Sequence, residues 1–198
     1  LVGYINIFFK KPKINFYIEL GTDDSRANFV DLRAHWDHAI GYVIGYKKYG
    51  LLGNPNIFIG METMSNRNST NTLNDKFYRG DWDIPNFYNR GLYLHSSYEG
   101  RRWGAHSGSD SIDRIIMLGL IKNNFSIISS FNFERRGVIS QNFPEKKYEA
   151  MLLLKMQKKN IGYTLYFENE KIYNYNFNKN YKPKNSNVVG LGIVFNFN

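Results

Sequence analysis

The feature that most constrains the fold of this chain is an alternation of apolar and polar side chains with a period of two. It recurs in segments of about ten residues, which is the pattern of strands with two unlike faces. The alternation is clearest near the C-terminus, where one side of an extended chain carries Val189, Leu191, Ile193, Phe195 and Phe197. The other segments that show it are 5–9, 15–21, 40–46, 57–61, 114–121, 125–134, 148–157 and 161–168. The sequence therefore predicts about nine strands.

The connections between these strands alternate in length. Short connections lie at 10–13, 50–55, 122–124 and 158–160, and long connections lie between them at 23–38, 65–111, 135–146 and 170–187. Outer-membrane barrels have short periplasmic turns, long extracellular loops and tilted strands of about 9 to 11 residues. We therefore expect an all-β fold, an antiparallel transmembrane β-barrel with long extracellular loops.

The parity of the strands adds an expectation about the domain. An odd number of strands that ends in the periplasm would make the chain start on the long-loop side of the barrel. We therefore expect at least one further strand upstream of Leu1. Residues 1–198 are then the C-terminal part of a single outer-membrane β-barrel domain.

Composition excludes several other classes of protein. Cysteine is absent, which excludes disulfide scaffolds and cysteine-based zinc sites, and no stretch approaches the roughly 20 apolar residues of a transmembrane helix. The formal net charge is +9, but the basic residues are spread through turns and loops instead of forming one stripe, so we expect no nucleic-acid partner. The lysine-rich short turns are suited to contact the lipid of an outer membrane.

A soluble β-sandwich or barrel explains the alternation equally well, because its apolar face would be an ordinary core. Two features favour the membrane barrel. The polar sides of the segments are rich in Gly, Ser, Asn and single acids, as a water-filled lumen would be, and Tyr and Phe gather near the segment ends. Sandwich strands also need only about 5 or 6 residues.

Several parts of the chain resemble known membrane proteins. Residues 190–197 (Gly-Leu-Gly-Ile-Val-Phe-Asn-Phe) are similar to the closing strand of outer-membrane barrels. Residues 88–91 (Tyr-Asn-Arg-Gly) and the glycine-arginine, glycine-histidine and glycine-aspartate run at 98–111 resemble the capsule assembly Wzi family, as do Glu19 with Asp23 and Asp24 and the strand at 41–45. The resemblance covers nearly the whole chain as the C-terminal portion of that family's barrel. The chain departs from the family in lacking the N-terminal portion and in its Asn- and Lys-rich composition.

The resemblance implies a protein of the Gram-negative outer membrane that binds and anchors capsular or other surface polysaccharide. It implies a lectin-like anchor at the cell surface, with no enzyme activity and no cofactor. The second function that we consider is a porin-like channel for small solutes. The oligomeric state is left open.

The longest connection carries the residue types that bind sugars. Aromatic rings stack on the apolar faces of pyranose rings, and Arg and Asp supply directional hydrogen bonds. The candidate polysaccharide-binding residues are Trp82, Tyr88, Arg90, Tyr98, Arg101, Arg102, Trp103, His106 and Asp110. In the alternative interpretation, the loop folds into the lumen and its charges pair there with acids such as Glu62, Asp113 and Glu149.

Other groupings point less clearly to chemistry. His35 and His38 place two imidazoles three residues apart with no third ligand nearby, so we expect no metal site. Ser107 and Ser109 lie beside His106 and Asp110, but the members of a catalytic triad are usually distant in sequence. Glu19 with Asp23 and Asp24 offers carboxylates whose separation is not readable from sequence.

Overall fold

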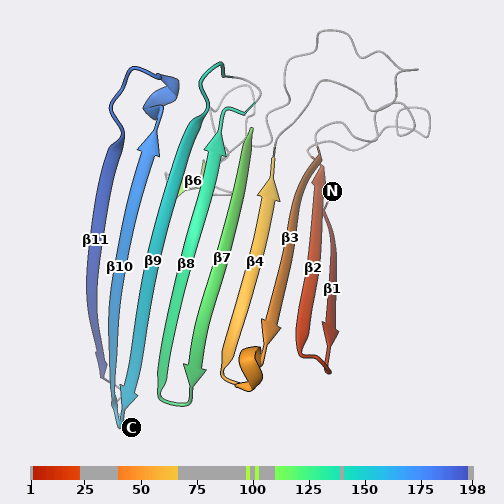
Figure 1. The fold of residues 1–198 in the computed structure, drawn as a ribbon, viewed down its shortest axis with the longest axis vertical. Helices are drawn as coiled ribbons and strands as arrows, with labels where there is room; N and C mark the ends of the chain where they lie inside the picture. The colour runs from red at the N-terminus through yellow and green to blue at the C-terminus, as the bar shows by residue number, and fades with distance from the viewer. Residues whose placement is uncertain are drawn as a thin grey trace, which may run out of the picture.

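The main part of the fold is an antiparallel sheet of nine strands, as shown by a computed structural model that describes residues 2–22, 40–66, 97–98, 101–102, 110–138 and 141–195 (Figure 1). Neighbours in the sheet follow one another along the chain, so the sheet is a meander. In sheet order the strands are β1 (Val2–Phe9), β2 (Ile14–Thr22), β3 (Ile40–Tyr49), β4 (Ile57–Ser65), β7 (Ser111–Lys122), β8 (Phe125–Arg136), β9 (Glu145–Lys158), β10 (Ile161–Tyr173) and β11 (Lys184–Phe195). The predicted all-β class and the nine strands are confirmed.

Three smaller features complete the described part of the chain. A separate two-stranded ladder pairs β5 (Ser97–Tyr98) with β6 (Arg101–Arg102). Two single-turn 3-10 helices, η1 (Leu51–Gly53) and η2 (Tyr175–Phe177), lie in the connections that follow β3 and β10. Within these described ranges, no helix has the length and hydropathy that crossing a membrane would need.

The connections sort by length onto the two ends of the sheet. Short turns join β1 to β2, β3 to β4, β7 to β8 and β9 to β10 at one end, whereas the segments 23–39, 66–110, 137–144 and 174–183 connect the strands at the other end (Figure 1). The predicted alternation is therefore confirmed. We call the two ends the short-turn end and the long-connection end.

The strands extend further than the alternation predicts. β9 begins at Glu145 and β10 continues to Tyr173, so both run beyond the predicted segments at the long-connection end. In these extensions both faces carry polar residues, so the alternation of hydropathy fades while the backbone ladder continues, with Glu170 still opposite Glu149.

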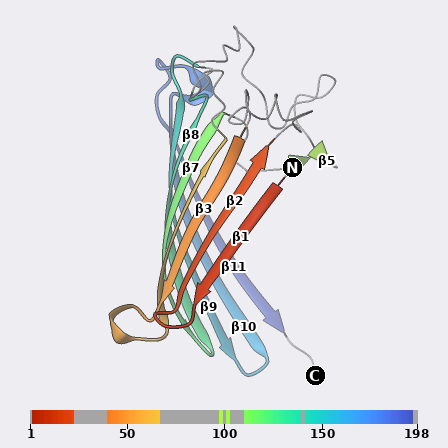
Figure 2. The same cartoon turned by 90° about the vertical axis from the view of Figure 1, so that its right-hand side faces the viewer.

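The sheet is one bent layer. In Figure 2 the middle strands β7 and β8 lie on one side, and the two edge strands β1 and β11 are both displaced toward the other, which gives the layer a trough-like curvature. The main contacts between the described elements are those between adjacent strands, with η1 against β4 and η2 against β9. No second layer covers either face within the described residues, whereas a soluble sandwich requires one.

The register assigns each strand residue to one of two faces, because residues that pair across strands point to the same side. One row of paired residues on what we call the apolar face is Leu191, Leu165, Leu154, Ile127, Leu120 and Ile57, from β11 to β4. A row on the opposite, polar face is Glu170, Glu149, Asn132, Ile115, Glu62, Gly45 and Tyr17.

The burial of the two faces is inverted relative to a water-soluble protein. On the apolar face Leu191 is 83% exposed and Val189 is 67% exposed, whereas on the polar face Asn132 and Glu134 are only 5% and 3% exposed. Of the described apolar side chains, Phe58 alone is buried, and it lies on the polar face. The concave side of the sheet is therefore the polar one, and the apolar side chains point outward.

Candidate functional site on the polar face

The densest charged cluster lies on the polar face toward the long-connection end and is centred on Lys147 of β9. The Lys147 Nζ lies 3.2 Å from Glu134 Oε2 on β8, 3.1 Å from Glu149 Oε2 and 3.6 Å from Glu170 Oε2 on β10. Alternation places these side chains on one face, and the register brings them together. A carboxylate as buried as that of Glu134 is costly to hold in the sheet without a cation beside it.

A second cation extends this cluster to the rim of the sheet. The Arg136 Nε lies 3.9 Å from Glu134 Oε1, and its Nη1 lies 3.3 Å from Glu145 Oε1. The other oxygen of Glu145 accepts a hydrogen bond of 3.0 Å from the backbone N–H of Asn176 in η2. This hydrogen bond ties the connection between β10 and β11 to Glu145 of β9, which the ion pair with Arg136 holds in place.

Three carboxylates in the cluster are close enough to share one cation. Glu149, Glu168 and Glu170 each offer an oxygen within 4.8 Å of the others, and the Tyr166 hydroxyl donates a hydrogen bond to Glu168. Carboxylate oxygens are ligands for hard cations such as Ca²⁺. However, Lys147 already lies against two of the three, so the cluster carries its own counter-charge.

Tyr17 spans three strands on the polar face. Tyr17 of β2 is level with Gly45 of β3, which is level with Glu62 of β4, and the Tyr17 hydroxyl donates a hydrogen bond to the Glu62 carboxylate. The ring passes over Gly45, where a Cβ would clash with it. Glycine is therefore required for this bridge.

Phe58 makes a similar arrangement nearer the short-turn end. Its ring lies over Gly119 on the neighbouring strand, where an added Cβ would again clash. The Lys47 Nζ lies 4.5 Å from the centroid of the Phe58 ring, and the Tyr49 ring lies 5.8 Å from it. The one buried apolar side chain of the described residues is thus held by a glycine below and a cation beside it.

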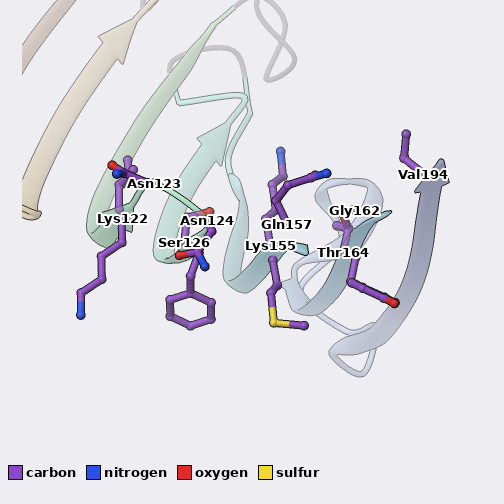
Figure 3. A pocket seen from close by; sticks show the side chains of 13 residues that line it. Lys122, Asn123, Asn124, Ser126, Lys155, Gln157, Gly162, Thr164 and Val194 are labelled. Carbon is purple, nitrogen blue, oxygen red and sulfur yellow. The ribbon is translucent and has the colours of Figure 1, made fainter. Parts of the chain in front are cut away.

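The short-turn end of the polar face carries an open hollow of about 360 Å³ at the turns that join β7 to β8 and β9 to β10 (Figure 3). Its lining includes Ser126, Lys155 and Thr164, which the register places in one row. The Gln157 Nε2 donates a 2.8 Å hydrogen bond to the Lys159 carbonyl and stabilises the adjacent turn. In this region polar side chains therefore continue to the end of the polar face, together with Ile121 and Val194.

The acids that the sequence assigns to a lumen all lie on the polar face. Glu62 and Glu149 have their partners, Tyr17 and Lys147, within the sheet itself, and Asp113 is buried. Glu19 lies on the same face of β2, opposite Val43. Sequence reasoning missed the Lys147 cluster, although the alternation of Glu168 and Glu170 already signals two acids on one face.

Most candidate polysaccharide-binding residues lie outside the described residues, namely Trp82, Tyr88, Arg90, Trp103 and His106. The same holds for Asp23, Asp24, His35, His38, Ser107 and Ser109. Of Tyr98, Arg101 and Arg102 the structure describes the backbone ladder, in which Tyr98 pairs with Arg101.

Asp110 lies at the foot of the long connection between β4 and β7. It is 7% exposed, and its φ of 52° is in the left-handed region. Its N–H donates to the Asn66 carbonyl at 3.2 Å, and its carbonyl accepts from the Gly137 N–H at 2.9 Å and the Val138 N–H at 3.2 Å. Its backbone therefore joins the 66–110 and 137–144 connections.

Comparison with protein-family models, with curated proteins and with solved structures finds no match to this chain in any of the three. The resemblance to the capsule assembly Wzi family therefore stays a prediction.

Proposed function

We propose that this chain forms part of the wall of a Gram-negative outer-membrane β-barrel that binds and anchors capsular or other surface polysaccharide through its long connections. The apolar face would contact lipid, and the polar face would line the lumen. The observation that carries the proposal is the inverted burial, because exposed rows of Leu, Ile, Val and Phe are stable only against another apolar phase.

The distribution of charge on the apolar face supports the membrane assignment. The strand residues of this face include no acid, and the basic ones lie toward the strand ends: Lys48, Arg114, Lys122, Arg135, Lys146, Lys158 and Lys171. The apolar residues lie between them as a band. Such a band with charged borders is what the hydrocarbon core and the head groups of a bilayer select.

The lower border of the band also has the slope of a barrel. The row of Lys122 contains Met156, which lies two residues farther from the short-turn end than Lys158 of the same strand. The row of Lys48 contains Leu118, which lies four residues farther from that end than Lys122. Six residues over the four steps from β9 to β3 are about 1.5 residues per strand. That is about 5 Å of rise for a strand spacing of about 4.8 Å, or a tilt of about 45°, close to the 35–45° of outer-membrane strands.

The polysaccharide-binding part of the proposal rests on the glycine-arginine, glycine-histidine and glycine-aspartate run. That run belongs to the 66–110 connection, whose two ends meet at Asn66 and Asp110 at the long-connection end. Long connections of outer-membrane barrels are extracellular. This end of the sheet would therefore face the capsule.

Two adjacent residues of β10 test the membrane assignment. Leu165→Arg places a charge in the middle of the apolar band, whereas Thr164→Arg places the same charge on the polar face. In bilayers we expect Leu165→Arg to lower the free energy of unfolding by about 2–4 kcal/mol and Thr164→Arg to change it far less. Equal effects of the two variants, measured by urea titration in lipid vesicles, would contradict the membrane assignment.

The polysaccharide role is tested on cells that express the protein. We expect the Arg101→Gln/Arg102→Gln variant to retain less surface polysaccharide, while the charge-matched control Lys10→Gln/Lys11→Gln in a short turn retains the normal amount. Both variants must reach the outer membrane in wild-type quantity, shown by fractionation. Normal retention by the double arginine variant would argue against a binding role for these residues.

A porin-like channel is the second candidate, and the polar hollow at the short-turn end favours it. The row of Ser126, Lys155 and Thr164 places polar side chains along this hollow, next to Ile121 of β7. A channel predicts an ohmic single-channel conductance in planar bilayers. A barrel plugged by its loops predicts none.

A further inference from the structure

Four basic side chains gather on the apolar face at the long-connection end, one on each of four adjacent strands. They are Arg114 of β7, Arg135 of β8, Lys146 of β9 and Lys171 of β10, and we call them the basic patch. Arg135 is directly opposite Lys146, while Arg114 and Lys171 lie one row closer to the apolar band. The patch spans three strand spacings, about 14 Å.

The basic patch has no counter-charge in the described sheet. The face contains no acid, and the ion pairs of the described residues involve Arg136 and Lys147 on the other face. Like charges directly opposite one another destabilise a sheet. In addition, the Arg135 Nε is buried and has no hydrogen-bond partner. An anion bound from outside the sheet would supply the missing counter-charge.

Aromatic rings occupy the same two rows as the basic patch. Tyr148 lies 5.1 Å from Phe133 and 5.8 Å from Tyr173 between ring centroids, and the Lys171 Nζ lies 5.0 Å from the Tyr173 ring. Tyr rings interleaved with basic side chains at the border of an apolar band are typical of the depth of lipid head groups. The anion would therefore be attached to a lipid.

An apolar groove begins beside the patch. A hollow of about 340 Å³ adjoins Arg114, and the apolar face contributes Ile44, Tyr46, Met61 and Ile116 to its lining. The apolar lining of the groove suits an acyl chain that descends from a head group held at Arg114.

We propose that the basic patch binds the phosphorylated head group of a lipid A-type glycolipid, with an acyl chain in the adjoining groove. The inference rests on the proposed orientation, in which the long-connection end lies in the outer leaflet. A head group with two phosphates suits a patch of this width, because each phosphate can accept charge-assisted hydrogen bonds from two of the four cations.

The test measures binding of lipid A in three forms, bisphosphorylated, monophosphorylated and dephosphorylated, to the purified protein in detergent. We expect affinity to fall in that order. The Arg135→Gln/Lys146→Gln variant should bind the bisphosphorylated form about tenfold more weakly or worse. Its matched control, Lys122→Gln/Lys158→Gln, removes the same charge from the same face at the short-turn end and should bind like the wild type.

Two results would overturn the inference: wild-type affinity of the Arg135→Gln/Lys146→Gln variant, or equal affinity for the dephosphorylated form. Folding of each variant is checked by its insertion into phosphatidylcholine vesicles. Failure of the wild type to insert there would refute the proposed membrane function. Insertion without a preference for phosphate would refute the glycolipid site alone.

Discussion

The substitution Gly119→Ala tests whether the polar face is packed as tightly as the structure indicates. Phe58 is 2% exposed and its ring lies directly over Gly119. An added Cβ would meet three atoms of that ring, and even the third nearest, Cδ1, would lie only 2.9 Å away. Because the clash involves a rigid ring, either the ring leaves its site or the two strands shift.

Both responses cost stability. Displacing the ring forfeits the burial of a Phe side chain, which is about 1.5–3 kcal/mol, and retaining it strains the sheet by about 1–3 kcal/mol. Because the less costly response sets the effect, we expect Gly119→Ala to lower the free energy of unfolding by about 1–3 kcal/mol. The matched control is Gly192→Ala, where a Cβ would meet the Thr164 Cβ at an ordinary 3.5 Å, so the change should stay within about 0.5 kcal/mol.

Urea titration of the protein in lipid vesicles, followed by the gel mobility of the folded form, measures these energies. A double-mutant cycle with Phe58→Ala isolates the contact, because removal of the ring opens the space that the added methyl group would need. We expect the cost of Gly119→Ala to vanish in that background, with a coupling energy of about 1 kcal/mol or more. Strictly additive energies would refute the packing of this ring over glycine.

Two further substitutions test the polar face. Lys147→Met removes the nearest cation from the buried Glu134, and it should lower the urea midpoint by an amount equivalent to about 3 kcal/mol. Adding Glu134→Gln should restore most of the lost stability, and a double variant without restored stability would contradict the ion pair. Gly45→Ala should displace the Tyr17 ring from Glu62 and lower the free energy of unfolding by about 1–2 kcal/mol. The same substitution in a Tyr17→Ala background should lower it less, and urea titration of the three variants measures both effects.

The sheet and its two faces were predictable from sequence because alternate residues of most strands differ in hydropathy. Within the hairpin of β9 and β10, the short turn even fixes the pairing. Once Lys158 is opposite Ile161, counting back along both strands places Glu149 opposite Glu170. A charged pair on the polar face could therefore be derived without coordinates.

Pairing across the longer connections could not be derived in this way. Asn132 meets Glu149 only because Arg136 pairs with Glu145 across the 137–144 connection, and a connection of that length does not determine a register. The cluster around Lys147 depends on both pairings. The burial of Phe58 could not be predicted for another reason. As an aromatic residue on the polar side of its strand it breaks the alternation, and its burial depends on Gly119, which is distant in sequence.

Because the two faces of the sheet differ in polarity, the sheet is sensitive to changes in the length of its strands. If one residue were deleted within β9 near its short turn to β10, every β9 side chain on the far side of the deletion would change faces, which would move Glu149 to the apolar face and Leu154 to the polar face. The same deletion in the 174–183 connection would leave all nine strands in phase. A change in the length of a connection therefore leaves both faces in phase, whereas within a strand only an insertion or deletion of an even number of residues does so.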